Sequence, residues 1–251
     1  MSQSTLAVQM YTVREAAAED FPGALRRVAE LGYDAVELAG MHDLSVTELG
    51  QLLTDLGLKV VSGHVPLPDL RSSLEQRIET YLALGADYLV CPWLPPEERS
   101  NEDGFRSIAA ELDQIGARCR AQGLQFCYHH HDFELVQFSG KYGLDILLLN
   151  SDPAHVQLEA DTYWLKVAGV DPADYIHRWS GRVPLVHIKD VTASEPPTFG
   201  EVGSGILDWD EILKTSKKAG TKWYIVEQDR CPGDPFASLQ ISIENYRQLV
   251  S

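Results

Sequence analysis

Apolar runs and amphipathic stretches alternate regularly along the chain. Six amphipathic stretches end in a glycine, and a short apolar run follows closely, as in LGYDAVEL, LGLKVVSG and AGTKWYIVE. Glycine after a helix adopts the left-handed conformation that caps the last carbonyl groups of that helix. The alternation therefore predicts repeated units in which a helix ends at a glycine and a strand begins.

Residues that favour helix starts stand at the beginnings of the amphipathic stretches. Asp171 and Asp234 each precede a proline, which places a capping oxygen before a proline at the first helical position. The spacing of a capping box occurs at Ser45 with Glu48, Ser72 with Glu75, and Asp208 with Glu211. These residues predict helices between the apolar runs.

Eight apolar runs have the length of strands. We predict strands over about 5–11, 34–38, 58–63, 87–91, 124–130, 156–161, 183–188 and 222–228. The runs are nearly continuous, which is typical of strands covered by helices on both faces. Eight such units predict an α/β protein with one (β/α)8 TIM barrel over residues 1–251. An open doubly wound sheet is the alternative, but YTVREA follows the first strand where that fold has a glycine-rich phosphate turn.

The composition limits the partners of such a barrel. The chain has 21 basic and 37 acidic residues, a formal net charge of −16, and 44% hydrophobic residues, enough for a sizeable core. A surface this negative repels nucleic acid and anionic lipid, so we expect neither, whereas a small-molecule carbohydrate substrate is compatible with it. We find no apolar run of membrane-spanning length, no signal-peptide pattern and no C-x-x-C pair, so we expect a cytoplasmic protein.

Polar residues with catalytic or metal-binding chemistry gather at one end of the predicted strands. In a TIM barrel the functional site lies at the carboxyl ends of the strands. The residues at or just after these ends are Gln9, Tyr11, Glu37, His64, Cys91, Trp93, His129, His131, Glu134, Glu159, Asp161, His187, Lys189, Asp190, Glu227, Gln228 and Asp229. Buried carboxylates repel one another unless a cation offsets their charge. The rim therefore predicts a divalent metal.

The preferred metal ligands come from the last four strands and are Glu134, Asp161, His187 and Glu227. Three carboxylates and one imidazole suit Mn²⁺ first, with Mg²⁺, Co²⁺, Fe²⁺ or Zn²⁺ as alternatives. Each residue also has a structural interpretation. Asp161 could cap the next helix, His187 could be a hydrogen-bonded core histidine, and Glu134 lies beyond its strand. Glu227 stands inside an apolar run, where glutamate is rarely structural.

The stretch YHHHDFEL offers a different metal site. His129 and His131 lie on the same side of an alternating strand, whereas His130 points away from them and is expected to be structural. A His-x-His pair binds metal in amidohydrolase barrels, but there it follows the first strand and not the fifth. His64 is the preferred further contact for a substrate, and Trp93 offers an apolar wall for a sugar ring.

The chain resembles the sugar phosphate isomerase/epimerase family, the xylose isomerase-like TIM barrels, over nearly its whole length. The motifs that carry the resemblance are LGYDAVELAG, YHHHDFEL, VQLEADTYWLKVAGVDP, RVPLVHIKD, EVGSGILDW and WYIVEQD. The family often has H-N-H-D-F-E where this chain has His130 in place of the asparagine. Carried onto this sequence, the four metal ligands of the family fall on Glu134, Asp161, His187 and Glu227.

The resemblance also implies a reaction and further roles. Relatives remove a proton next to a ketone and form an enediolate that a divalent metal stabilises. Glu134 and Glu227 would then be acid/base catalysts, while His64, His131 and Lys189 would hold substrate oxygens. The implied activity is isomerisation or epimerisation of a keto sugar.

Other activities and assemblies stay open. The alternatives are a lyase or dehydratase acting on a keto sugar, an inosose or a 3-keto-glycoside, and a sugar-binding barrel without turnover. DNA-repair endonucleases form a related branch, but they need a basic groove, which the net charge of −16 disfavours. Relatives are often dimers or tetramers, so the resemblance leaves a homo-oligomer open.

Overall fold

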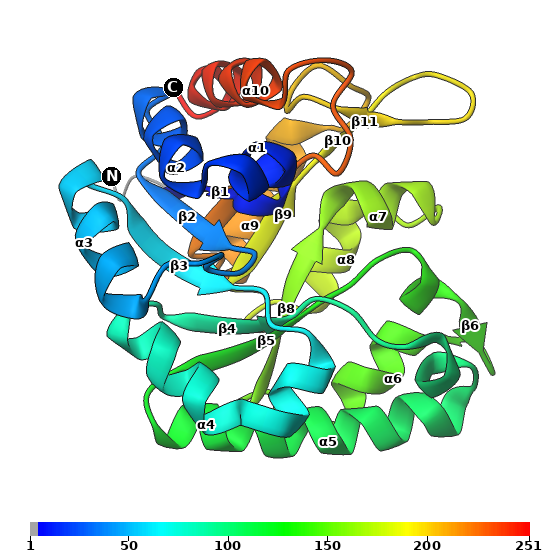
Figure 1. The fold of residues 1–251 in the computed structure, drawn as a ribbon. Coiled ribbons are helices and arrows are strands. Elements are labelled where there is room, and N and C mark those ends of the chain that lie inside the picture. The colour runs from blue at the N-terminus through cyan, green and yellow to red at the C-terminus, as the bar shows by residue number, and fades with distance from the viewer. Residues whose placement is uncertain (1–4) are drawn as a thin grey trace.

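Eight parallel strands form a nearly closed barrel with helices around it (Figure 1). This computed structural model describes residues 5–251. Hydrogen-bonded neighbours follow the order β3-β2-β1-β12-β9-β8-β5-β4. The two ends of this order meet where His64, just after β3, pairs with Val90 in β4, and Val65 N donates to Val90 O at 2.8 Å. The predicted (β/α)8 barrel in a single domain is confirmed.

Each predicted strand contains one strand of the barrel. Their bounds are β1 Thr5–Gln9, β2 Ala35–Leu38, β3 Lys59–Gly63, β4 Tyr88–Cys91, β5 Gln125–His129, β8 Val156–Asp161, β9 Leu185–Ile188 and β12 Trp223–Val226. The first strand ends two residues earlier than predicted, because a 3-10 helix, η1, begins at once over Met10–Val13. Two short hairpins, β6 Gln137–Phe138 with β7 Lys141–Tyr142 and β10 Asp190–Val191 with β11 Phe199–Gly200, lie outside the barrel and were not predicted.

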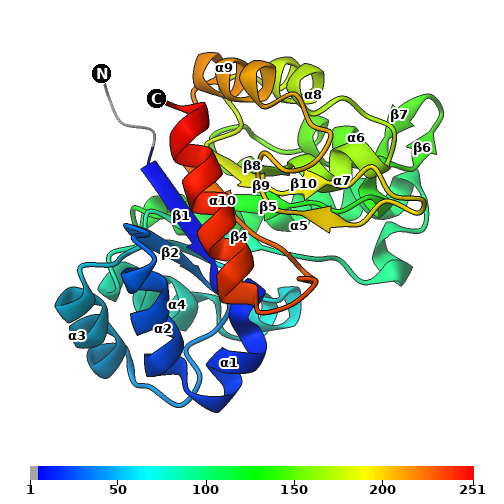
Figure 2. The same ribbon diagram turned by 90° about the horizontal axis from the view of Figure 1, so that it is seen from above.

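Helices connect the strands on the outside of the barrel. They are α1 Arg14–Glu19, α2 Phe21–Glu30, α3 Val46–Leu56, α4 Leu67–Ala83, α5 Glu102–Ala121, α6 Gly143–Leu149, α7 Thr162–Val167, α8 Pro172–Arg178, α9 Trp209–Ala219 and α10 Pro235–Leu249. Helix α10 is tied to the N-terminal part of the barrel, since Arg247 Nη2 donates to Gly32 O at 2.8 Å; it lies next to α2 in Figure 1 and runs between α9 and α2 in Figure 2. No helix within residues 5–251 has the length and apolar character to cross a membrane.

Most of the predicted helix caps form. Four capping residues accept a backbone hydrogen bond from the first turn of their helix, namely Ser45, Asp171, Asp208 and Asp234. The helix start predicted at Ser72 is displaced by one residue, because α4 begins at Leu67 and its second helical segment follows a kink. The helix is kinked at the next residue, Ser73 (φ −149°, ψ 37°), whose hydroxyl donates to Asp69 O at 3.0 Å.

Two layers of side chains fill the inside of the barrel. The lower layer is apolar and takes one residue from each of seven strands: Ala7, Ala35, Val61, Val90, Cys127, Leu185 and Ile225. Because side chains alternate along a strand, the next interior position lies two residues further on. On five strands that position holds a buried polar residue, namely Gln9, Glu37, His129, His187 and Glu227. The barrel therefore has an apolar floor and a polar layer toward the carboxyl ends of its strands.

Candidate active site

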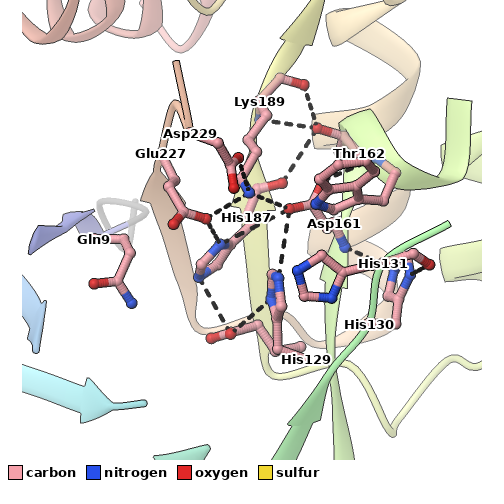
Figure 3. A network of polar contacts seen from close by, with 12 residues as sticks. Gln9, His129, His130, His131, Asp161, Thr162, His187, Lys189, Glu227 and Asp229 are labelled. Carbon is pink, nitrogen blue, oxygen red and sulfur yellow. Dashed lines mark hydrogen bonds and ion pairs between the residues drawn. The ribbon is translucent and has the colours of Figure 1, made fainter. Parts of the chain in front are cut away.

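Four polar side chains converge at the carboxyl ends of β5, β8, β9 and β12. Their candidate ligand atoms lie within 4.8 Å of one another, and the residues are His129, Asp161, His187 and Glu227. They point toward one another in Figure 3, where His187 Nδ1 lies 2.8 Å from Glu227 Oε2. Asp161 Oδ2 lies 3.9 Å from both His129 Nε2 and His187 Nδ1. Two imidazoles and two carboxylates form a donor set that suits a divalent transition metal.

A second group of candidate ligands shares two histidines with the first. It consists of His64, His129, Glu159 and His187. His64 Nε2 lies 2.9 Å from Glu159 Oε2, which is also 3.1 Å from His129 Nδ1. Glu37 is adjacent, with its Oε2 2.6 Å from His187 Nε2. Glu37 and Glu159 stood at strand ends in the sequence without an assigned role. Glu37 lies two residues beyond Ala35 of the apolar floor, so the period of two places it in the polar layer, whereas Glu159 pairs with Leu185 of that floor and follows no floor residue on β8.

The ammonium group of Lys189 lies against the carboxylates of the first group. Its Nζ is 2.6 Å from Glu227 Oε2, 3.0 Å from Asp161 Oδ2 and 2.8 Å from Asp229 Oδ2 (Figure 3). The side chain is buried. Burial opposes its charge, but the three carboxylates offset this and hold the pKa of Lys189 well above its usual range. The site therefore already favours positive charge between Asp161 and Glu227.

The buried atoms of the first group fit a metal ion. Asp161 Oδ2 and His129 Nδ1 are buried and make no aligned hydrogen bond, although Lys189 Nζ lies 3.0 Å from the oxygen and Glu159 Oε2 lies 3.1 Å from the nitrogen. Burial raises the pKa of Asp161 to about 6, although Lys189 and His187 lower it. Buried carboxylates beside neutral imidazoles need a cation to offset their charge, and one cation shared by these ligands would bind both kinds of donor atom. The donor set is thus that of a candidate metal site.

Glu134 lies apart from these groups, although the sequence placed it among the ligands. Its Oε2 accepts from His131 N at 2.8 Å, and its Oε1 accepts from the Tyr128 hydroxyl. The cause is a 3-10 helix, η3, over Phe133–Leu135, which turns the side chain back toward β5. Burial raises the pKa of Glu134 to about 7. Within the described residues it belongs to no group of candidate ligands.

The three consecutive histidines have different surroundings. His129 lies inside the barrel and contributes to both ligand groups. His130 is buried and its Nε2 accepts from Asp161 N at 3.0 Å, a structural contact that holds the end of β8 (Figure 3). Burial lowers the pKa of His130 to about 4, which suits this acceptor role. His131 stacks on Phe133 with ring centroids 5.0 Å apart.

A cavity of about 520 Å³ opens above the candidate metal ligands. Its lining includes the residues that the sequence indicated for substrate contact, which are His64, Trp93, His131 and Lys189, together with Glu227 and His129. It also includes residues without any sequence signal, from the loop after β2 and from α4: Ala39, Gly40, Met41, Asp69, Arg77, Thr80 and Tyr81. These residues reach the cavity from a loop and a helix and not from the end of a strand. The pattern of strand ends could therefore not identify them.

The fold and the ligand ring define a TIM barrel with a candidate metal centre at the carboxyl ends of its strands. The family model described as xylose isomerase-like TIM barrel matches residues 25–249. The chain therefore belongs to the xylose isomerase-like TIM barrel family. The resemblance read from the sequence motifs is confirmed.

Relatives with assigned names are enzymes. Inosose dehydratase from Geobacillus kaustophilus (strain HTA426) is 27% identical, and the match covers 92% of this chain and 91% of that protein. Inosose dehydratase from Lacticaseibacillus casei is 30% identical over 54% of this chain and 51% of that protein. These relatives place the chain among enzymes of this family.

Solved structures share the fold. A sugar phosphate isomerase/epimerase from Parabacteroides distasonis ATCC 8503 superposes with a TM-score of 0.85 at 22% identity, covering 100% of this chain and 96% of that one. An IolI protein with a bound zinc atom gives 0.79 at 17% identity, covering 98% of both chains. At these identities the likeness shows the barrel alone.

Proposed function

We propose that the protein is a divalent-metal-dependent lyase of the dehydratase type, acting on a ketone of a sugar or a cyclic polyol. The observation that carries this proposal is the position of Glu227. Its carboxylate belongs to the candidate ligand group, contacts Lys189 at 2.6 Å and lines the cavity. The dehydratase names of the relatives support the same reaction class.

The metal site is assigned to His129, Asp161, His187 and Glu227, with Glu134 as the alternative fourth ligand from the family resemblance. A divalent metal, when bound there, supplies positive charge that stabilises the oxygen anion formed when a proton leaves the carbon next to a ketone. The zinc atom in the IolI structure supports a divalent ion in this fold. Mn²⁺ is our first choice, because the set combines carboxylate oxygens with imidazole nitrogens.

Glu227 acts as the base in this proposal. Burial raises its pKa, but Lys189 and His187 more than offset this and hold the pKa of Glu227 below its usual range. The carboxylate is therefore ionised and able to accept a proton. A carboxylate with a low pKa is a weak base, so the reaction needs strong stabilisation of the negative charge that develops on the substrate. Lys189 orients Glu227 and adds positive charge at the same place.

The elimination balances with a single acid/base group. Glu227 takes the proton from the carbon next to the ketone, and the electrons of that C–H bond form the enolate. The enolate then expels the hydroxyl group on the next carbon, which takes the proton back from Glu227 and leaves as water. The product is an unsaturated ketone, and Glu227 is restored as a carboxylate.

Epimerisation, one of the activities first indicated by the resemblance, needs a second acid/base group. Epimerisation returns the proton to the opposite face of the substrate. Glu134 was the sequence candidate for that role, but both of its oxygens are hydrogen-bonded to Tyr128 and His131, and it does not line the cavity. This arrangement supports elimination over epimerisation.

Solvent deuterium exchange tests the proposal. The manganese-loaded protein is incubated in D₂O with a panel of inososes, ketoses and 3-keto-glycosides, and the products are analysed by mass spectrometry and NMR. We expect loss of one water together with deuterium uptake in the substrate pool. Glu227→Gln should abolish both, whereas the exposed Glu75→Gln should leave both unchanged.

Three results would contradict this function. Exchange with formation of an isomer and no loss of water would identify an isomerase or epimerase. No exchange with any ketone in the panel would favour a sugar-binding barrel. Full activity of Glu227→Gln would remove that residue from the mechanism.

A further inference from the structure

The cavity continues beyond the metal ligands into the other half of the barrel. Around the ligands it is lined by His64, His129, His131, Lys189, Glu227 and Asp229. A second part, here called the extension, is lined by Ala39, Gly40, Met41, Val65, Pro66, Asp69, Arg77, Thr80, Tyr81, Pro92 and Trp93. These residues follow β2, β3 and β4 or belong to α4. The whole cavity of about 520 Å³ falls within the roughly 300–1,000 Å³ that encloses a drug-sized ligand, more than one small ring requires.

The extension contains a built polar pair. Arg77 Nη2 donates to Asp69 Oδ2 at 2.8 Å, and both residues line the cavity. They are eight positions apart in α4, which is about 12 Å along the axis of a regular helix. The kink at Ser73 turns the first part of α4 so that the two side chains meet. Among the described residues, Arg77 Nε is buried and has no hydrogen-bond partner. A donor and acceptor pair of this kind suits hydroxyl groups.

The other walls of the extension are apolar. Met41, Val65, Pro66 and Trp93 surround the polar pair, and Trp93 is 43% exposed. A sugar ring has hydroxyl groups at its edge and C–H groups on its faces. An aromatic or aliphatic wall contacts the C–H faces, while a paired guanidinium and carboxylate bind the edge. The lining therefore has the chemistry of a sugar subsite.

The charges of the cavity disfavour phosphate. The permanently charged cations in the lining are Arg77 and Lys189, and each is already paired with carboxylates. Arg77 binds Asp69, while Lys189 binds Asp161, Glu227 and Asp229. Asp69, Glu227 and Asp229 themselves line the cavity. A phosphate needs cations that are not yet neutralised, and like charges in its surroundings repel it.

We propose that the substrate is a neutral, unphosphorylated glycoside, with its ketone-bearing ring at the metal ligands and a second sugar ring in the extension between Arg77 and Trp93. This inference rests on the proposed function for the reacting ring only. Arg77 and Asp69 bind the hydroxyl groups of the second ring and do not touch the reacting atoms.

Calorimetry with unreactive probes tests the extension without turnover. The manganese-loaded protein is titrated with methyl β-glucoside, methyl β-cellobioside and glucose 6-phosphate. We expect the two-ring probe to bind at least about tenfold more tightly than the one-ring probe, because the second ring adds contacts in an enclosed site. Glucose 6-phosphate should bind no more tightly than methyl β-glucoside.

Substitutions in α4 locate the second ring. Arg77→Met should weaken binding of methyl β-cellobioside about tenfold, the cost of a hydrogen bond to a charged group, and leave methyl β-glucoside unchanged. Thr80→Val removes a hydroxyl group from the same wall and should weaken binding of methyl β-cellobioside by less than Arg77→Met does. Arg118→Met removes an exposed arginine that pairs with Glu75 away from the cavity, and it should change neither affinity. Thermal unfolding of each variant verifies that it is folded.

Several outcomes would overturn the inference. They are equal affinity for the one-ring and two-ring probes, tightest binding of glucose 6-phosphate, or the same affinities for Arg77→Met and Arg118→Met. The proposed reaction fails in a different experiment, when no ketone exchanges deuterium. The two proposals are therefore tested separately.

Discussion

The Nζ of Lys189 lies 2.6 Å from Glu227 Oε2, with both side chains buried at the carboxyl ends of β9 and β12. The same ammonium group contacts Asp161 and Asp229. A buried cation in contact with three carboxylates is strongly held, and its removal leaves their repulsion uncompensated. Lys189 thus connects the proposed base with a candidate metal ligand and with the cavity.

Lys189→Met should lower kcat by about 10²–10³-fold, because it removes a preorganised positive charge from the place where negative charge develops. Lys189→Arg keeps the charge and should retain more activity. Initial rates on the most active ketone of the panel measure both effects. Equal losses in the two variants would show that the shape of the lysine, and not its charge, is what matters.

His129→Asn and Glu134→Gln distinguish the two candidates for the fourth metal ligand. If His129 binds the metal, its loss should weaken Mn²⁺ affinity by more than the roughly 10–100-fold that an outer hydrogen-bond partner contributes. Glu134→Gln should then change metal affinity little. Titration with Mn²⁺, followed by paramagnetic resonance of the free ion, gives both constants, and His155→Asn is a matched control outside the ligand groups. A large loss in Glu134→Gln alone would assign the ligand to Glu134.

Asp190 holds the loop between β10 and α9. Its Oδ2 accepts from Gly203 N and Gly205 N at 3.0 Å and from Trp209 Nε1 at 2.7 Å. Asp190→Ala leaves these donors without their acceptor, so we expect a loss of about 2–4 kcal/mol in the free energy of unfolding. Urea unfolding measures it. Asp210→Ala, exposed at the start of the same helix, should cost much less, and similar losses in both variants would contradict the anchoring role.

Gly116→Ala should destabilise the protein although alanine favours helices. A Cβ at Gly116 in α5 would overlap the backbone oxygen of His155, which cannot move aside without shifting β8. Gly50→Ala in α3 is the control, because the nearest atom to its Cβ, Leu84 Cδ2, is 3.9 Å away. Gly50→Ala should stabilise by about 0.5–1 kcal/mol. Opposite signs in urea unfolding are expected, and stabilisation by both would show that α5 can move.

The barrel was predictable from the sequence because its strands are buried apolar runs and six of the eight closely follow a glycine with positive φ: Gly32, Gly57, Gly85, Gly123, Gly181 and Gly220. The start of α4 was not predictable. Ser72 and Glu75 have the spacing of a capping box, but the helix already begins at Leu67, after Pro66. A kink at Ser73 separates the two segments. Local spacing therefore indicated a break in α4 but not its nature.

The site was predictable where a residue lies on a strand and not where it lies beyond one. Asp161, His187 and Glu227 keep the period of two and converge as expected. Glu134 follows β5 by five residues, and its direction depends on the 3-10 helix η3. Arg77 reaches the cavity through the kink in α4, which no periodic pattern reveals.

The ligands of the first candidate group, His129, Asp161, His187 and Glu227, come from β5, β8, β9 and β12, whereas the walls of the extension follow β2, β3 and β4. The residues proposed for the reaction and those proposed for substrate selectivity are thus carried by different strands of the barrel. Transfer of the segment from β3 to α4 into a related barrel should therefore change which substrates that barrel binds, while its own candidate metal ligands stay the same.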